Sequence, residues 1–190
     1  MTIIYSCLLP AMWLAYLLYW LAKSTNVKST DRKESPLSRI VRLVLIVSAV
    51  VLLGLPNIPL GALNARFLPA GITRFWTGCA LTIGGLLLSI WARDQLGNNW
   101  SQAVTVKDGH QLITSGPYAF VRHPIYSGLL LAFVGSAVAL GEWRGLLATA
   151  LVLGALWYKL RLEEKWMHVQ FGDSYASYSK RVKALVPYII

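Results

Sequence analysis

The chain has 190 residues, 56% of them hydrophobic, and its mean hydropathy of +0.53 is too high for an ordinary soluble domain. Its formal net charge is +10, but the positive residues flank apolar runs, which favours membrane topology and anionic lipid headgroups over a nucleic-acid partner. Cys7 and Cys79 lie inside apolar runs without a second type of metal ligand, so we expect neither a disulfide framework nor a metal site. These features predict an all-α integral membrane protein with a single domain over residues 1–190.

Two apolar runs occupy the first third of the chain. The first, at 3–22, has about the 20 uncharged residues that are needed to cross the hydrocarbon core. Positive residues follow this run from Lys23 onward, whereas a signal peptide would carry them before it. We therefore expect a retained first transmembrane helix with its N-terminus outside. The second run, at 40–63, contains Pro56 and Pro59, which should break or kink its helix.

A third apolar run, at 75–91, precedes the most polar part of the chain. The run contains three glycines that permit close helix contact: Gly78, Gly84 and Gly85. Polar character then returns over 93–124, which is long for a connection. Connections of this length in compact proteins tend to be functional or disordered.

Two further apolar runs, at 125–140 and 145–158, complete five predicted transmembrane helices. Only four residues separate them, which predicts an antiparallel helical hairpin. Beyond residue 158 the pattern becomes amphipathic. We expect the fifth helix to continue into the cytoplasm, to stop near Gly172, and to resume as a short helix that contains Tyr175 and Tyr178.

The distribution of Lys and Arg predicts the orientation in the membrane. With five spans and the N-terminus outside, only three of the eighteen basic residues lie on the outer side: Arg66, Arg74 and Arg144. The C-terminus is then cytoplasmic. The segments 93–124 and 159–190 share that face, where we expect them to form a cofactor pocket together.

A polar motif stands directly before the fourth predicted helix. Pro124 disfavours a helical backbone at His123 and suits the first turn of the helix that follows. The N-terminus of that helix directs its N–H groups toward the polar segment, where an anionic or carboxylate group would be well placed. Alternatively, Arg122 is only an interfacial anchor and His123 only a helix cap.

A pair of acidic residues follows the fifth predicted helix. Lys159 and Glu163 are four residues apart and share one helical face, whereas Glu164 is expected to point elsewhere. The pair either solvates the helix exit or binds an amine or hydroxyls of a charged cofactor. A sulfonium cofactor requires a carboxylate, backbone donors and aromatic faces. Residues of these types are Glu163, Tyr118, Tyr126 and the backbone of Leu112 and Ile113.

Three segments together resemble the isoprenylcysteine carboxyl methyltransferase family: GHQLITSGPY, RHPIYSG and, after a membrane hairpin, LEEKWMHVQFGDSYASYSKRV. The resemblance covers about residues 96–187 and extends to the family's short prokaryotic members with five membrane helices. It implies a multi-pass protein of the prokaryotic inner membrane that binds S-adenosyl-L-methionine at its cytoplasmic face. Its methyl acceptor would be a lipophilic or lipidated molecule, such as one with the carboxylate of a prenylcysteine, and it would need neither nucleic acid nor a metal.

The resemblance also implies roles for single residues. Arg122, in the family's Arg-His-Pro motif, would act in catalysis by orienting the acceptor. Lys159 stands where the family often has an arginine that contacts substrate, and Arg161 follows two residues later, so both are candidate substrate-binding residues. Because lysine lacks the bidentate fork of arginine, a thiol, amine or phospholipid acceptor stays open. The implied cofactor shell is His110, Gln111, Leu112, Ile113, Tyr118, His123, Pro124, Ile125, Tyr126 and Glu163.

Two other classes of function are compatible with the sequence. A membrane reductase that uses NADPH on a lipid substrate is one, because sterol reductases have a loosely similar C-terminal pattern. Such an enzyme should need more spans and a clearer basic cluster for phosphate. The other is a non-catalytic membrane protein whose cytoplasmic loop binds a partner.

Overall fold

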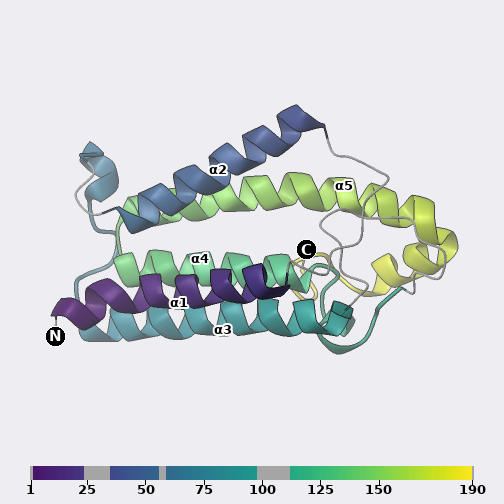
Figure 1. Ribbon diagram of the computed structural model, residues 1–190, viewed down its shortest axis with the longest axis horizontal. Helices are drawn as coiled ribbons and strands as arrows, with labels where there is room; N and C mark the ends of the chain where they lie inside the picture. The colour runs from purple at the N-terminus through teal and green to yellow at the C-terminus, as the bar shows by residue number, and fades with distance from the viewer. Residues whose placement is uncertain (1, 24–34, 56–58, 98–111, 190) are drawn as a thin grey trace.

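The computed structural model describes residues 2–23, 35–55, 59–97 and 112–189, with side chains from residue 7 onward. Within these ranges the protein is helical, and its long helices run roughly along the long axis of the molecule (Figure 1). The elements are α1 (Thr2–Lys23), α2 (Pro36–Gly54), the 3-10 helix η2 (Gly61–Asn64), α3 (Ile72–Leu96), the 3-10 helix η4 (Gly116–Ala119), α4 (Pro124–Leu140) and α5 (Trp143–Arg181).

Three of the described helices, α2, α3 and α5, are long and apolar enough to cross a membrane. α4 is an apolar helix of 17 residues, which is at the short end for a span, and α1 has 22 residues, of which Cys7–Lys23 also form an apolar helix. The predicted all-helical, membrane-associated architecture is thus confirmed in its coarse form. The number of spans and their orientation stay predictions.

The ends of α2 and α3 differ from the predicted runs. α2 begins at Pro36 because the Ser35 side chain caps it by accepting a hydrogen bond from the Ser38 amide at 3.3 Å. It ends at Gly54, just before the proline that was predicted to break it, so the range 40–63 is wrong at both ends. α3 continues to Leu96, and the predicted polar connection therefore begins later than residue 93.

The longer α3 is explained by contacts that its polar end makes with α1. The buried guanidinium of Arg93 donates to the carbonyl of Lys23, and the Tyr19 hydroxyl donates to Asp94 at 2.8 Å. The hydroxyls of Tyr16 and Ser89 form a further hydrogen bond of 2.7 Å. These contacts hold α1 against α3.

α3 and α4 approach closely along a line of glycines. A Cβ atom on Gly85 would collide with the carbonyl of Gly128, and a Cβ on Gly128 would collide with that of Gly85. Gly78 packs against Ala139 in the same way. The predicted role of these glycines is confirmed for Gly78 and Gly85, but it is wrong for Gly84, which is exposed and has open space around it.

The predicted hairpin of the last two apolar runs is formed by α4 and α5. Gly141, in the left-handed region with φ 70°, ends α4 and allows α5 to begin at Trp143. Residues 143–171 of α5 would extend about 43 Å at 1.5 Å per residue, more than the ~30 Å of hydrocarbon. The far half of α5 therefore projects beyond the apolar part of the bundle.

α5 also changes direction where the sequence predicts. Gly172 has φ 51° and ψ −125°, which interrupts the helix and directs its last turns back toward the bundle. Tyr175 and Tyr178, on these last turns, are buried. At its other end α5 is tied to α2, because the buried guanidinium of Arg144 donates to the carbonyls of Leu52 and Leu55.

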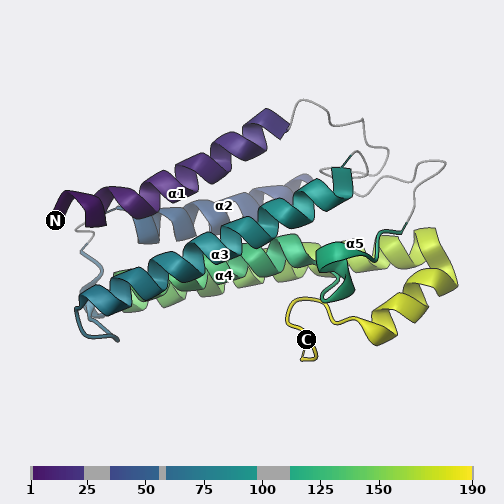
Figure 2. The ribbon, with the colours of Figure 1, turned by 90° about the horizontal axis from the view of Figure 1, so that it is seen from below.

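Different elements of the chain gather at the two ends of the bundle (Figure 2). η2, the start of α3 and the start of α5 lie at the same end as the N-terminus, where Arg66 and Glu142 form an isolated β-bridge. η4, the start of α4 and the bent end of α5 lie at the opposite end, together with the C-terminus. The three arginines assigned to the outer side are therefore gathered at one end of the molecule.

Candidate active site

The segment before α4 is held in place by the C-terminal segment. The amides of Arg122 and His123 donate to the carbonyls of Lys183 at 2.8 Å and Ala184 at 3.0 Å. The Ser127 hydroxyl donates to the carbonyl of Leu185 at 2.6 Å. Because α5 bends at Gly172, residues about sixty positions apart in the chain become neighbours here.

His123 occupies the N-cap position of α4 with a non-helical backbone, φ −124° and ψ 61°, and Pro124 fills the first turn. Pro124 thus keeps His123 out of the helical region, as predicted, although the ψ of His123 is smaller than the extended values of about +120° to +160°. The imidazole stacks on the Tyr126 ring, with centroids 5.5 Å apart and planes 3° from parallel. Both rings face α5, which supplies the acidic side of the site.

Glu163 lies against both rings. Its Oε1 accepts a hydrogen bond from the Tyr126 hydroxyl at 2.6 Å, and its Oε2 is 3.6 Å from Nδ1 of His123. The Lys159 ammonium is 3.5 Å from Oε1 and 5.5 Å from the centre of the Tyr126 ring. The structure thus brings together four residues that sequence reasoning selected.

Glu164 is also part of the cluster, and the prediction that it points elsewhere is wrong. It accepts two hydrogen bonds from Arg122, at 2.8 and 2.9 Å, one from the Tyr175 hydroxyl at 2.8 Å, and pairs with Nε2 of His123 at 2.8 Å. Consecutive residues on a helix point about 100° apart, so Glu163 and Glu164 reach the two nitrogens of one imidazole that lies between them. Sequence signals for this arrangement were the adjacency of the two acids and the spacing of Tyr175 and Tyr178.

Arg122 is engaged by the protein on every side of its guanidinium. Beside its bonds to Glu164, Nη1 donates to the carbonyls of Ser179 and Val182 at the end of α5. Only 12% of the side chain is exposed. Burial acts to lower the pKa of Arg122, but its bonds to Glu164 outweigh burial and raise it. The guanidinium therefore joins the start of α4 to the bent end of α5.

The electrostatics favour a protonated His123. Burial alone would lower the pKa of this imidazole, yet the hydrogen bonds and charges of Glu163 and Glu164 outweigh it and raise the pKa above its ordinary value of 6.5. The imidazole, between two carboxylates, forms a compact network of ionisable groups together with Arg122 and Lys159. Such a network fixes the positions of all its members.

The other described residues of the predicted shell lie in η4, at the start of α4 and in the segment before η4. Tyr118 is buried in η4, and its hydroxyl donates to the carbonyl of Ala92 at 3.3 Å while its own carbonyl accepts from Tyr178. Pro124 is buried, and Ile125 packs on the main core. Leu112 and Ile113 are half-buried in the segment before η4. His110 and Gln111 lie outside the described residues.

The two candidate substrate cations are separated by the helix. Lys159 faces Glu163 and Tyr126, with 27% of its side chain exposed. Arg161 is exposed, and its guanidinium stacks over the ring of Trp157 at 5.8 Å. Only Lys159 therefore has a position at the cluster.

Comparison with known proteins identifies the family. A family model described as phospholipid methyltransferase matches residues 73–174, which include all but the first residue of α3, the whole of α4 and both glutamates. Protein-S-isoprenylcysteine O-methyltransferase of Schizosaccharomyces pombe is 36% identical over 108 residues, which are 55% of this chain and 46% of the relative. Protein-S-isoprenylcysteine O-methyltransferase B of Arabidopsis thaliana is 30% identical over 129 residues, 65% of this chain and 66% of the relative.

The Homo sapiens protein-S-isoprenylcysteine O-methyltransferase is 32% identical over 116 residues, 60% of this chain and 41% of the relative. The chain thus spans less than two thirds of the length of these three relatives. The family match itself covers more than half of the chain and includes the charged cluster between α4 and α5. The chain belongs to the phospholipid methyltransferase family and is similar, within it, to the protein-S-isoprenylcysteine O-methyltransferases.

Proposed function

We propose that the protein is a membrane methyltransferase that uses S-adenosyl-L-methionine to methylate the carboxylate of a prenylcysteine-like acceptor. The observation that carries this proposal is the cluster of Lys159, His123, Tyr126 and Glu163 at the start of α4. It supplies an acceptor for an ammonium group and a cation for a carboxylate within a few ångströms of one another. The names of the relatives support both the reaction and the carboxylate acceptor.

The residues present fit the cofactor. Oε1 of Glu163 already accepts from Tyr126, whereas Oε2 is 3.6 Å from His123 and keeps capacity for the ammonium of the cofactor's amino acid end. The ring faces of Tyr118 and Tyr126 suit a sulfonium cation, and Leu112, Ile113, Pro124 and Ile125 supply apolar surface for adenine. His110 and Gln111 complete the proposed shell. When bound, the cofactor supplies an electrophilic methyl group.

A carboxylate acceptor has to be positioned by the protein, but it does not have to be activated by a base. It is already ionised at neutral pH, so no general base is required, and holding it in line with the methyl group lowers the barrier. Lys159 is the cation that would pair with this carboxylate, and Arg161 would not, because it stacks on Trp157 away from the cluster. Arg122 orients the acceptor indirectly, by fixing Glu164 and His123.

The proposed membrane arrangement has five spans, with the N-terminus outside and the C-terminus in the cytoplasm. The cofactor pocket forms at the cytoplasmic end, between the segments 93–124 and 159–190, and the lipophilic acceptor enters from the membrane. The gathering of Arg66, Arg74 and Arg144 at the opposite end of the bundle supports this orientation.

A phospholipid acceptor is the second candidate, because the matching family model is described by that substrate class. An amine or thiol acceptor would use the same methyl donor. Family membership weighs against a reductase that uses NADPH and against a protein without catalytic activity.

Thermal unfolding of the detergent-purified protein tests the cofactor assignment. S-adenosylhomocysteine at about 100 times its dissociation constant should stabilise the folded state by about 2.7 kcal/mol, whereas NADPH should leave the midpoint unchanged. Glu163→Gln should abolish this shift, and Lys165→Gln, which changes an exposed residue on the same helix, should preserve it. A shift with NADPH alone, or an unchanged shift in Glu163→Gln, would contradict the proposal.

A further inference from the structure

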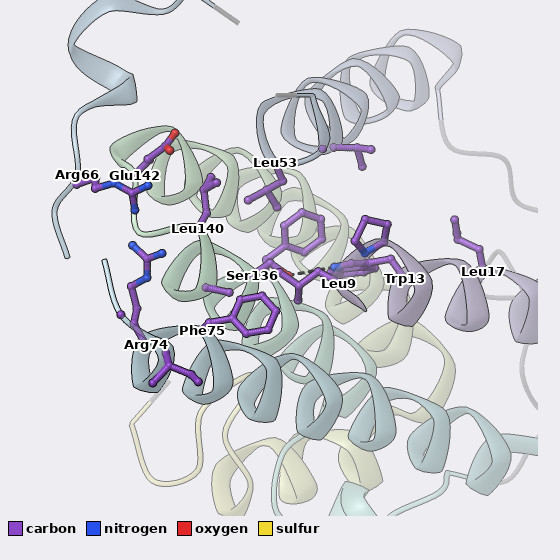
Figure 3. A pocket seen from close by; sticks show the side chains of 17 residues that line it. Leu9, Trp13, Leu17, Leu53, Arg66, Arg74, Phe75, Ser136, Leu140 and Glu142 are labelled. Atoms are coloured by element: carbon purple, nitrogen blue, oxygen red, sulfur yellow. Dashed lines mark hydrogen bonds between the residues drawn. The ribbon is translucent and has the colours of Figure 1, made fainter. Parts of the chain in front are cut away.

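A cavity of about 730 Å³ (Figure 3) extends to the start of α3, which lies at the end of the bundle opposite the candidate active site (Figure 2). This volume is within the ~300–1,000 Å³ that small-molecule sites occupy. α1, α2, α3 and α4 all contribute to its wall, which is mainly apolar. The principal apolar side chains are Leu9, Trp13, Leu53, Phe75, Phe133 and Leu140.

Two aromatic rings form part of the cavity wall. Trp13 and Phe133 pack with their centroids 4.8 Å apart, and the Trp13 indole donates to the Ser136 hydroxyl at 3.0 Å. Tyr126 lies seven residues before Phe133 on α4, about 10 Å along the helix axis. The cavity is therefore distinct from the cluster around Glu163.

The opposite end of the cavity is positively charged. Arg66, Arg74 and Glu142 lie there, and Figure 3 shows the guanidinium groups of both arginines at this end. Glu142 already pairs with the buried Arg144 at 2.7 Å. The charges of Arg66 and Arg74 are thus left in excess at the mouth, which favours an anionic ligand.

The Arg74 guanidinium makes few hydrogen bonds within the described chain and could therefore bind a ligand. Its Nε is buried and has no hydrogen-bond partner among the described residues, and its Nη1 makes only a long contact of 3.4 Å with the carbonyl of Leu68. Gly141, with φ 70°, leaves the space that the guanidinium fills, because a Cβ there would overlap it. A buried donor without a partner is costly, so an external acceptor would relieve it.

The start of α3 adds a second source of positive potential. Gly71, its N-cap residue, has no side chain with which to cap the helix, and Gly71 and Ile72 both line the cavity. The N–H groups of an uncapped first turn attract anions. The helix terminus and the two arginines thus converge on one mouth.

We infer that this cavity binds an anionic phospholipid of the surrounding membrane. The phosphate lies between Arg66, Arg74 and the start of α3, where guanidinium groups bind it in a bidentate manner. One acyl chain lies in the apolar cavity, against Trp13 and Phe133. A lipid is favoured over a soluble anion because exposed apolar side chains flank the cavity: Leu17, Val50 and Ile72.

Photocrosslinking in lipid nanodiscs tests the inference. The full chain is reconstituted with a trace of phosphatidylglycerol or phosphatidylcholine that bears a photoactivatable group on one acyl chain, and labelled peptides are mapped. Phosphatidylglycerol should label 9–17 and 133–140 preferentially. Arg66→Gln with Arg74→Gln should reduce this labelling about tenfold, as expected for the loss of a charge-assisted hydrogen bond. Arg39→Gln, an exposed change on α2, should have no effect.

Two further experiments are controls. One tests whether the glutamine variant loses labelling because it misfolds, and the other tests whether the ligand is a soluble anion. Arg66→Lys with Arg74→Lys keeps both charges and should retain most of the labelling, which guards against a loss caused by misfolding. Equal labelling by both lipids, or labelling that survives the double glutamine change, would overturn the inference. It would equally be overturned if inorganic phosphate alone raised the unfolding midpoint as much as phosphatidylglycerol does, because the ligand would then be a soluble anion.

Discussion

Replacing Glu164 by Gln should loosen the whole candidate active site while leaving its shape nearly unchanged. This carboxylate accepts two hydrogen bonds from Arg122 and one from Tyr175, and pairs with His123. Glutamine removes the charge and presents an amide N–H group to donors of Arg122, His123 or Tyr175 that the carboxylate now accepts. Arg122 is then left charged, largely buried and without its anionic partner.

The cost of this change follows from burial. Removing one partner of a buried ion pair costs about 3–5 kcal/mol, and an exposed pair contributes about 0–1 kcal/mol. Because only 12% of the Arg122 side chain and 16% of the Glu164 side chain are exposed, the pair lies near the buried limit. We expect a loss of about 3 kcal/mol, which lowers the unfolding midpoint by about 6–12 °C for a chain of this length.

Thermal unfolding in detergent, with and without S-adenosylhomocysteine, measures both stability and site integrity. Glu142→Gln is a matched control, because Glu142 pairs with the buried Arg144 at the other end of the bundle. It should be destabilised to a similar degree and keep its full response to the ligand, whereas Glu164→Gln should lose most of that response. Asp94→Asn alters a half-exposed pair and should cost less than about 1 kcal/mol. If Glu164→Gln behaves like Asp94→Asn, the structural role assigned to Glu164 is refuted.

Three further predictions concern pH, packing and a buried arginine. Because the fold raises the pKa of His123, its contribution to stability is complete below the ordinary value of 6.5 and is lost as pH rises through the folded value; His123→Asn should flatten the midpoint-against-pH curve over that range. Gly85→Ala should separate α3 from α4 and cost about 3 kcal/mol or more in unfolding free energy, whereas Gly84→Ala should cost almost nothing, and equal losses would contradict the packing. Arg144→Gln should lower the midpoint by removing donors from the carbonyls of Leu52 and Leu55, and an unchanged midpoint would contradict that role.

Sequence reasoning succeeded where a single residue decides the local backbone. Pro124 restricts His123 and starts α4, and Gly172 interrupts α5. The proline after Gly54 likewise marks the end of α2. Each outcome follows from steric rules that operate over one or two residues, so it can be read without knowledge of the tertiary structure.

Sequence reasoning failed where the position of a residue depends on a contact with a residue far away in the chain. Glu164 joins the cluster because α5 bends and the C-terminal segment returns beside Arg122, a contact that no local pattern contains. α3 extends to Leu96 because α1 provides partners for Arg93 and Asp94. The cavity at the other end likewise depends on how four separate helices converge, and its lining residues look in the sequence like ordinary membrane helix.

The sequence indicated which residues form the candidate site, but it did not indicate how these residues are arranged. His123, Tyr126, Glu163 and Lys159 were selected by motif and spacing, and the structure brings them together. The choice between Lys159 and Arg161 could not be made from spacing, because both lie within one helical turn. Packing separates them, since Arg161 stacks on the exposed side of the helix over Trp157.

Methyl transfer to a defined acceptor tests the central claim most directly. The purified protein is incubated with S-adenosyl-L-methionine that carries a radiolabelled methyl group and with N-acetyl-S-farnesylcysteine, and label that base releases as methanol is counted. We predict a base-labile methyl ester, lost in Glu163→Gln, strongly reduced in Lys159→Ala and retained in Arg161→Ala. Label found only in phospholipid would contradict the carboxylate acceptor, and the absence of label from both products would contradict the assignment of a methyltransferase.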